Sequence, residues 1–240
     1  MLSKNQIRFI RSLKKKKFRQ THQLFLAEGI KVVEELINSS FVIHKLYATE
    51  SYSNPNKVSD IEMISEKELQ LISDFSSPNQ VMGIFEIPTP NDLNAQGITV
   101  VLDEINDPGN LGTIIRLCDW FGVNQLVCSQ NTVDCFNQKV VQASMGSLTR
   151  VSLHYVDIQS YLAQEKRVVY GTFLKGENIY TSQLEENAVI VLGNEANGIS
   201  NQIEKLIHTK ITIPQFGEQQ HTESLNVAMA SAIILSEFKR

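Results

Sequence analysis

The stretch ITVVLDEINDPGNLGTIIRLCDW, residues 98–120, decides the fold class of this chain. It begins with the β-branched apolar run Ile98–Leu102, passes through a polar loop, and ends in a pattern that predicts a helix over about 110–122. One face of that helix holds its apolar residues, which are Leu111, Ile114, Ile115 and Cys118. A buried strand followed by an amphipathic helix is the repeating unit of α/β proteins, so the stretch predicts that class.

The same alternation of strand and helix continues towards the C-terminus. Short apolar runs predict strands over 125–128, 168–173, 189–192 and 211–213. Helices are expected near 136–145 and 157–165, after Ser200, and from Ser224 onward. Because short, wholly apolar strands are typical of sheets that are covered on both faces, residues 98–240 are predicted to form a parallel-sheet domain.

A second, smaller α/β domain is predicted over residues 1–87. Its expected helices cover 3–19, 30–37 and 66–72, the last capped by Ser65, and its expected strands cover 24–27, 42–47, 61–64 and 80–85. Between the two domains, residues 88–97 hold two prolines followed by polar residues. That composition is typical of a linker, so we place the domain boundary there.

The composition excludes several classes of protein. Of the 240 residues, 42% are hydrophobic and only 18 are Gly or Pro, which excludes a collagen-like or disordered chain. Three cysteines, an odd number, argue against a disulfide scaffold. No apolar run approaches the ~20 residues of a membrane span, and the N-terminus lacks the apolar core of a secretion signal. We therefore expect a cytoplasmic protein without a membrane partner.

The net charge of −4 conceals an uneven distribution of charged residues. Residues 1–31 hold nine of the 22 basic residues and one of the 26 acidic ones, so this segment carries +8 and the remainder −12. A basic end on an acidic body favours a polyanionic partner. The alternative at this point is a solvated basic helix that has no partner.

Three loops lie where open α/β sheets carry their chemistry, beyond the carboxyl ends of strands. Residues 103–112 form the first, and Arg116 in the helix after it should point away from the apolar face. Residues 192–200 form the second, in which two glycines allow close backbone approach and Glu195 supplies a carboxylate. Residues 211–217 and 224–232 form the third, which ends in a helix rich in small residues. Each loop alone is equally compatible with a surface arginine, an ordinary turn or close packing within the subunit.

Other signatures are missing from the sequence. There is no GxGxxG dinucleotide motif, no HExxH and no GxSxG, and the cysteines and histidines lack the spacing of metal ligands. Gly171–Gly176 begins like a phosphate-binding loop, but Glu177 and Asn178 stand where Lys and Ser or Thr are required. We therefore expect no metal site.

Taken together and in order, the three loops resemble the SpoU (TrmH-like) branch of the SPOUT RNA methyltransferases. The matching residues are Asn106–Gly112 with Arg116, then Leu192–Gly198, then Ile213, Pro214, Gly217 and Ser224–Val227. Residues 4–87, especially Lys15–Glu35, also resemble the L30e-like substrate-binding domain that precedes many such enzymes. Residues 218–223 form a longer loop than the family usually shows, which can reshape the cofactor lid or the substrate entrance.

The resemblance implies a C-terminal trefoil knot, a homodimer, bent S-adenosylmethionine, and methyl transfer to a ribose 2′-hydroxyl of RNA. The implied catalytic cluster is Asn110, Arg116, Glu195, Ser224 and Asn226, some of it contributed by the partner subunit. The implied cofactor contacts are Thr172, Leu192, Gly193, Ile213 and Leu225. Because an arginine with a pKa above ~12 is a poor base, Arg116 is expected to clamp the substrate, with transient deprotonation as the alternative.

The basic N-terminal segment has an expected role within this resemblance. Its RNA-binding residues are predicted to be Lys14, Lys15, Lys16, Lys17 and Arg19, through contacts to phosphates. The expected substrate is ribosomal RNA of the 23S type, because an added N-terminal domain suits a large folded RNA, and transfer RNA is the second candidate. The alternative function is a non-catalytic RNA-binding or ribosome-assembly protein that retains the fold.

Overall fold

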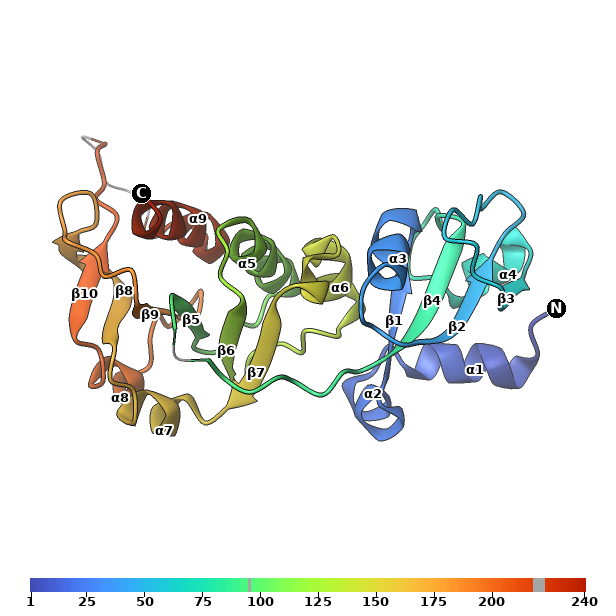
Figure 1. Ribbon diagram of the computed structural model, residues 1–240, viewed down its shortest axis with the longest axis horizontal. Coiled ribbons are helices and arrows are strands. Elements are labelled where there is room, and N and C mark those ends of the chain that lie inside the picture. The colour runs from blue at the N-terminus through green and yellow to red at the C-terminus, as the bar shows by residue number, and fades with distance from the viewer. Residues whose placement is uncertain (95, 218–222) are drawn as a thin grey trace. The chain divides into compact units, whose positions relative to one another are not determined.

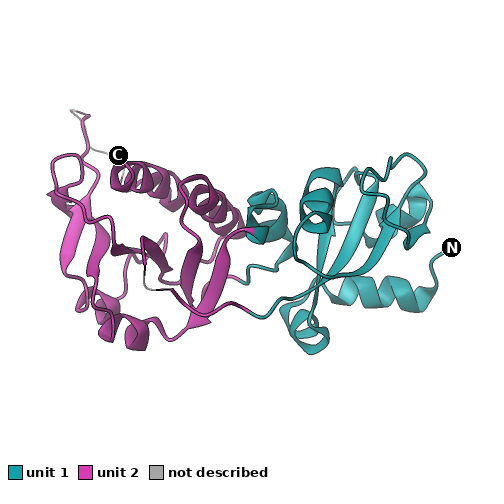
Figure 2. Ribbon diagram, in the orientation of Figure 1, with its two compact units in different colours: residues 1–89, 134–149 teal, residues 90–133, 150–240 magenta. Residues whose placement is uncertain are grey.

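The computed structural model describes residues 1–94, 96–217 and 223–240, and it divides into two compact units. Unit 1 contains residues 1–89 and 134–149, and unit 2 contains residues 90–133 and 150–240 (Figure 2). The chain first passes between the units at 89/90, inside the linker expected over 88–97. Residues 134–149, which the sequence placed in the second domain, belong to unit 1. The long 218–223 loop falls almost entirely outside the described residues.

Unit 1 is built on a four-stranded mixed sheet (Figure 1). Its strands, in the order in which they pair, are β1 (Leu24–Glu28), β4 (Val81–Glu86), β2 (Ile43–Ala48) and β3 (Ile61–Met63), and only β2 and β3 are parallel. Its helices are α1 (Lys4–Ser12), α2 (Lys16–His22), α3 (Ile30–Ile37) and α4 (Glu66–Ile72). Ser65 caps α4 in a capping box with Glu68, as the sequence predicted.

The single helix expected over 3–19 is wrong, because two helices occupy that segment. The helix α1 ends at Ser12, with Leu13 as its C-cap, and α2 begins after Lys15. The Arg19 guanidinium donates hydrogen bonds to the carbonyl oxygens of Leu13 and Lys14, which the end of α1 leaves without partners. Lys14 and Lys17, three residues apart, would also be neighbours of like charge on one continuous helix. The break therefore has both a local electrostatic cause and a compensating side chain.

Unit 2 contains a six-stranded sheet in which every pair of neighbours is parallel. In pairing order the strands are β10 (Thr209–Thr212), β8 (Val168–Asn178), β9 (Ala188–Leu192), β5 (Thr99–Leu102), β6 (Gln125–Ser129) and β7 (Ser152–Val156). The central strands β9, β5 and β6 are buried along their whole length. The parallel α/β class predicted from the apolar strands is confirmed. The edge strand β7 was not predicted, because it is only partly buried and lacks a continuous apolar run.

Helices cover both faces of this sheet (Figure 1). On one face, α7 (Ile158–Ala163) and α8 (Asn201–Glu204) pack on Val101, Val127 and Val189. On the other face, α5 (Pro108–Trp120) lies beside α9 (Val227–Phe238), and the Phe238 ring contacts the Tyr170 ring edge-on at 5.1 Å. The predicted apolar face of α5 is fully buried. The C-terminal helix begins at Val227 rather than at Ser224, because Asn226 caps it.

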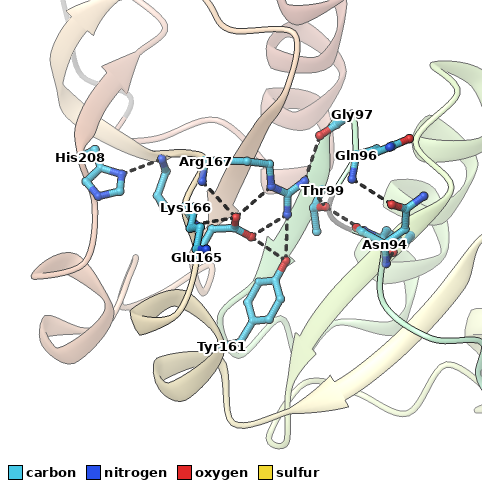
Figure 3. A network of polar contacts seen from close by, with 11 residues as sticks. Asn94, Gln96, Gly97, Thr99, Tyr161, Glu165, Lys166, Arg167 and His208 are labelled. Carbon is cyan, nitrogen blue, oxygen red and sulfur yellow. Dashed lines mark hydrogen bonds and ion pairs between the residues drawn. The ribbon is translucent and has the colours of Figure 1, made fainter.

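A buried ion pair at the start of β8 supports the amino end of the sheet (Figure 3). Arg167 Nη2 lies 2.6 Å from Glu165 Oε2 and 3.1 Å from the Tyr161 hydroxyl, and Arg167 Nη1 donates to the Gly97 carbonyl and the Thr99 hydroxyl. The guanidinium therefore joins α7, β8 and the segment that leads into β5.

The stability of unit 2 is expected to depend on the charge of Glu165. The Arg167 side chain and the backbone N–H groups of Arg167 and Lys166 lower the pKa of Glu165 to about 2. Since the pKa is depressed on folding, the stabilisation is complete above the ordinary value near 4.5 and is lost as the pH falls towards 2. Urea unfolding should show Glu165→Gln less stable than wild type at pH 7, with a difference that shrinks by pH 3. A pH-independent difference would contradict this assignment.

In the part of the chain that the structure describes, no helix has both the length and the apolar character needed to cross a membrane.

Candidate functional site

The loops after β5 and β9 meet at the point where the order of the strands reverses. From β5 the chain proceeds outward to β6 and β7, and it then returns to build β8, β9 and β10 on the other side. In open parallel sheets this reversal leaves a crevice at the carboxyl ends of the strands. Here an open pocket lies at that position, and its lining residues are Asn106, Asp107, Asn110, Asn194, Glu195, Ala196, Asn197 and Asn226.

The first turn of α5 brings Asn110 to this pocket. Asp107 is the N-cap of the helix, and its carboxylate accepts the backbone N–H of Asn110 at 2.8 Å. Pro108 follows at the first helical position, where its missing N–H has no cost. The sequence DPGN thus starts the helix and fixes Asn110 at its N-terminal end.

Three side chains from separate parts of the sequence form a continuous chain of hydrogen bonds in the pocket. Asn110 donates from Nδ2 to Glu195 Oε1 at 2.8 Å, and its Oδ1 accepts from Asn226 Nδ2 at 2.9 Å. Asn226 also caps α9, because its Oδ1 accepts the N–H groups of Ala228 and Met229. These contacts fix the orientation of both amides. The arrangement presents a carboxylate and two helix N-termini, a combination suited to hold a hydroxyl group next to a phosphate.

The loop after β9 is closed by its own backbone. Asn194 and Gly198 exchange N–H···O=C bonds of 3.0 and 2.9 Å, and the Asn194 side chain accepts the N–H groups of Ala196 and Asn197. Asn194 Nδ2 also donates to the Glu104 carbonyl at 2.7 Å, which joins this loop to the one after β5. The sequence analysis assigned no role of its own to Asn194 and missed this one.

Asp103 is a second residue that the sequence interpretation missed. It follows β5 directly, is only 4% exposed, and accepts the N–H of Ser200 at the start of α8 at 2.8 Å. Its own N–H donates to the Leu192 carbonyl at 2.9 Å. An acidic residue at the end of a wholly apolar strand was the available signal.

Two members of the predicted catalytic cluster do not join these contacts. Arg116 is exposed and lies six residues after Asn110, which at 100° per residue places it about 240° farther round α5. Among the described residues it has no hydrogen-bond or ion-pair partner, and it does not line the pocket. Ser224 is exposed, two residues before Asn226. One subunit therefore brings together Asn110, Glu195 and Asn226 only.

Four of the five predicted cofactor residues lie in, or directly after, the three adjacent strands β9, β8 and β10. Leu192 ends β9 and Gly193 follows it, Ile213 follows β10, and Thr172 lies in β8 between them. At Thr172 the pairing of β8 with β10 is interrupted, because the partner of Lys210 is Gly171 and that of Ile211 is Glu177. Leu225 is 51% exposed before α9. Apolar side chains and free strand ends next to the pocket fit a flat, hydrophobic group such as an adenine ring.

The predicted RNA-binding residues are only partly at the surface of unit 1. Lys15, Lys16 and Lys17 are exposed, and Lys14 is half-buried in an ion pair with Asp74. The expectation for Arg19 is wrong, because this side chain is buried and donates to Asp134 and to two backbone carbonyls. A guanidinium whose donors are already engaged stabilises the fold and cannot also bind phosphate. Among the described residues no group of three or more His, Cys, Asp or Glu side chains is arranged to hold a metal ion.

Two family models match the chain. Residues 97–236 match the SpoU rRNA Methylase family, and residues 4–83 match the MRM3-like substrate binding domain.

Individual relatives agree with these matches. The 23S rRNA (guanosine(2553)-2′-O)-methyltransferase RlmP of Bacillus subtilis is 29% identical over 97% of this chain and 96% of its own length. A TrmH-family structure from Porphyromonas gingivalis has a TM-score of 0.86 at 37% identity, covering 100% of this chain and 98% of that one. An AdoMet-bound rRNA methyltransferase from Sinorhizobium meliloti has a TM-score of 0.87 at 29% identity over 99% and 95% of the two chains. With the family model matched across more than half of its residues, this chain belongs to the SpoU rRNA methylase family.

Proposed function

We propose that this protein transfers a methyl group from S-adenosylmethionine to a ribose 2′-hydroxyl of ribosomal RNA. The observation that carries the proposal is the hydrogen-bonded chain Glu195–Asn110–Asn226 in the pocket at the strand-order reversal of a SpoU family member. The name of the B. subtilis relative, which matches 97% of this chain, supports ribosomal RNA of the 23S type over transfer RNA as substrate.

The chain's own residues supply positioning and charge. Bound at Thr172, Leu192, Gly193, Ile213 and Leu225, S-adenosylmethionine would provide a methyl group on a positively charged sulfur. Asn110 and Asn226, fixed by their mutual hydrogen bond, orient the ribose, and Glu195 accepts a hydrogen bond from the substrate or from Asn110. Arg116 clamps the adjacent phosphate, and Ser224 lies at the edge of the site. Correct alignment of the attacking hydroxyl accounts for much of the rate in a displacement of this kind.

A homodimer is part of the proposal. Arg116 and the pocket occupy different sides of α5, so the arginine that completes a site would come from a second copy of the chain. Unit 2 also exposes large apolar side chains on α5 and near α9, with Trp120 84%, Leu225 51% and Met229 62% exposed. Such exposure is typical of an interface between subunits. Family membership further supports a C-terminal trefoil knot. The cytoplasmic location is proposed from the sequence alone, since the relatives include the mitochondrial rRNA methyltransferase 3 of Xenopus tropicalis.

Unit 1 is proposed to bind the RNA through the first turn of α2, which Lys15 caps and Lys16 and Lys17 begin. Replacing Lys15, Lys16 and Lys17 with glutamine should weaken RNA binding at low salt and reduce the slope of log K against log salt by about 2 to 3. Filter binding to protein-free 23S rRNA at several salt concentrations measures both quantities. Affinity for S-adenosylmethionine, measured by calorimetry, should not change. An unaltered salt slope would contradict a role for this turn.

That triple substitution is preferable to removal of residues 1–20. Leu2, Ile10 and Leu13 are at most 6% exposed in the core of unit 1, so the deletion would unfold the unit and report nothing about charge.

The proposed function is tested by mapping 2′-O-methylation in total RNA from cells with and without the gene. One ribosomal position should lose its methyl group in the deletion strain and regain it when the wild-type gene is returned. If the position that loses its methyl group lies in a transfer RNA instead, the substrate is transfer RNA and not ribosomal RNA. The alternative, a non-catalytic ribosome-assembly protein, requires that no position changes and that calorimetry detects no binding of S-adenosylmethionine.

A further inference from the structure

Residues 134–149 belong to the fold of unit 1 although both of their ends continue into unit 2. The segment leaves unit 2 after Val133 and returns at Arg150. It contains α6 (Gln138–Ser144) and the short 3-10 helix Ser147–Thr149, and α6 packs on β1. It is therefore a covalent connection between the two units, in addition to the linker near residue 89.

The contacts of this segment within unit 1 are extensive. The ring centroids of Phe136 and of Phe25 in β1 are 4.8 Å apart. Gln138 Nε2 donates a hydrogen bond of 3.1 Å to Oε2 of the buried Glu28. Gly146 has φ +93°, and a Cβ there would lie 2.6 Å from the Cβ and Cγ of Glu35. Close packing of this kind makes the segment move with unit 1.

Asp134, the first residue of the segment, is bonded to Arg19, which lies in α2 close to the exposed Lys15, Lys16 and Lys17. Asp134 Oδ2 accepts from Arg19 Nε at 3.0 Å and from Arg19 Nη2 at 2.5 Å. The remaining nitrogen, Nη1, donates to the carbonyl oxygens of Leu13 at 3.1 Å and Lys14 at 2.8 Å. The Arg19 side chain is 3% exposed and that of Asp134 14%. One guanidinium thus fixes the backbone that precedes the three exposed lysines to Asp134.

The residue before the segment supports the loop that carries Asn110. Val133 donates its N–H to the carbonyl of Ile105 at 2.9 Å, and the Thr132 hydroxyl donates to the Leu102 carbonyl at 3.3 Å. Ile105 is fully buried and lies two residues before Asp107, the N-cap that fixes Asn110. Val133, which bonds to Ile105, and Asp134, which bonds to Arg19, are consecutive residues, so a single peptide bond joins the two interactions.

We propose that Arg19 and Asp134 are positioning residues that connect RNA binding at Lys15–Lys17 with the placement of Asn110. The proposal rests on the proposed function, since it assumes an RNA bound by the lysines and methyl transfer at Asn110. Binding energy from a remote part of a substrate raises kcat when it is used to align the reacting groups. The Arg19–Asp134 pair and the Val133–Ile105 hydrogen bond provide the contacts through which this alignment is made.

The test compares the variant Asp134→Asn with wild type and with Asp60→Asn as a matched control. Asp60 is also in an ion pair of unit 1, with Lys45, but its side chain is 81% exposed. Four quantities are measured with protein-free 23S rRNA from a strain that lacks the gene: kcat, the Kd for RNA, the Kd for S-adenosylmethionine, and the Tm. Asp134→Asn should lower kcat by about 3- to 30-fold, with both Kd values within about twofold of wild type and the control unchanged.

A double-mutant cycle separates coupling from simple damage to unit 1. Glutamine at Lys15, Lys16 and Lys17 should lower kcat in the wild-type background and have less effect on kcat in the Asp134→Asn background, because the connection is already broken. The proposal is overturned if the triple glutamine substitution lowers kcat by the same factor in both backgrounds. It is also overturned if Asp134→Asn leaves kcat unchanged, or if this variant loses as large a factor in RNA affinity as in kcat.

Arg19→Lys provides a second variant if Asp134→Asn does not fold. The ammonium keeps the ion pair with Asp134 but cannot also reach both carbonyls, so an intermediate kcat is expected and a wild-type kcat would overturn the proposal. If the wild-type protein transfers no methyl group to this RNA, the proposed function fails and the positioning role fails with it. An active wild type whose kcat is insensitive to both substitutions overturns the positioning role alone.

Discussion

Arg116→Ala is expected to lower kcat for methyl transfer by about 10²- to 10³-fold, the usual cost of losing a charged group that stabilises a transition state. Affinity for S-adenosylmethionine should remain within about twofold of wild type, because none of the predicted cofactor residues is on α5. Arg116 is exposed and its helix buries the opposite face, so the substitution should leave the Tm almost unchanged. Turnover close to wild type would exclude the role.

Arg116→Lys separates the two chemical roles considered for this residue. Lysine keeps the positive charge and loses the planar fork that binds a phosphate through two hydrogen bonds. A clamp should therefore retain a measurable fraction of the activity, with a raised KM for RNA. A rate that increases with pH in the lysine variant, and not in wild type, would instead indicate a base.

The origin of Arg116 in the partner subunit can be tested by mixing inactive variants. If each site combines Asn110 of one chain with Arg116 of the other, a mixed dimer of Asn110→Ala and Arg116→Ala chains contains one intact site. Re-equilibrated equal mixtures should then recover about a quarter of the wild-type activity. No recovery, in a mixture shown by mass spectrometry to contain mixed dimers, would place both residues in the same subunit's site.

Gly193→Ala is the second substitution with a large expected effect. A Cβ at this position would lie 2.3 Å from the carbonyl carbon of Gly198 and 2.3 Å from the nitrogen of Ile199. Because both are backbone atoms, no side chain can rotate away, and the loop closed by Asn194 and Gly198 must open. We expect a loss of about 2–4 kcal/mol in the free energy of unfolding and at least a tenfold loss of affinity for S-adenosylmethionine.

Gly122→Ala is the control for that experiment. Gly122 has φ +66°, but a Cβ there would meet nothing within 4 Å. Its substitution should therefore cost only the ~1 kcal/mol of a left-handed backbone and leave cofactor affinity unchanged. If Gly193→Ala and Gly122→Ala have equal free energies of unfolding, crowding of the Cβ at position 193 is not the cause of the lost stability.

Much of the fold follows from local patterns in the sequence. The apolar strands of unit 2 are continuous β-branched runs, and the amphipathic helix α5 has an apolar repeat that matches its buried face. The start of α4 was predicted at the correct residue because an N-cap serine is a local signal. Local signals failed where a side chain satisfies the backbone of an interrupted helix: α1 and α2 are separate helices, and Arg19 donates to the carbonyls of Leu13 and Lys14 between them, which no spacing rule reports.

The residues of the candidate site were likewise predicted only in part. The sequence identified Asn110, Glu195 and Asn226 through the order of three motifs, and the structure joins their side chains across 85 and 116 residues of sequence. It did not identify Asp103 or Asn194, because their partners are backbone groups of other loops. It also misplaced Arg19, since a basic residue in a basic run has the same pattern whether it is exposed or buried.

The sequence by itself determined the α/β class, the parallel sheet and the motifs of the SpoU family, because each is encoded in short-range periodicity or in the order of short segments along one chain. Only the tertiary structure decided that residues 134–149 complete the N-terminal unit, that Arg19 is buried against Asp134, and that Arg116 is turned away from its own pocket. These outcomes depend on contacts between residues far apart in the chain, and the free energy of such contacts is set by packing and burial rather than by the local sequence.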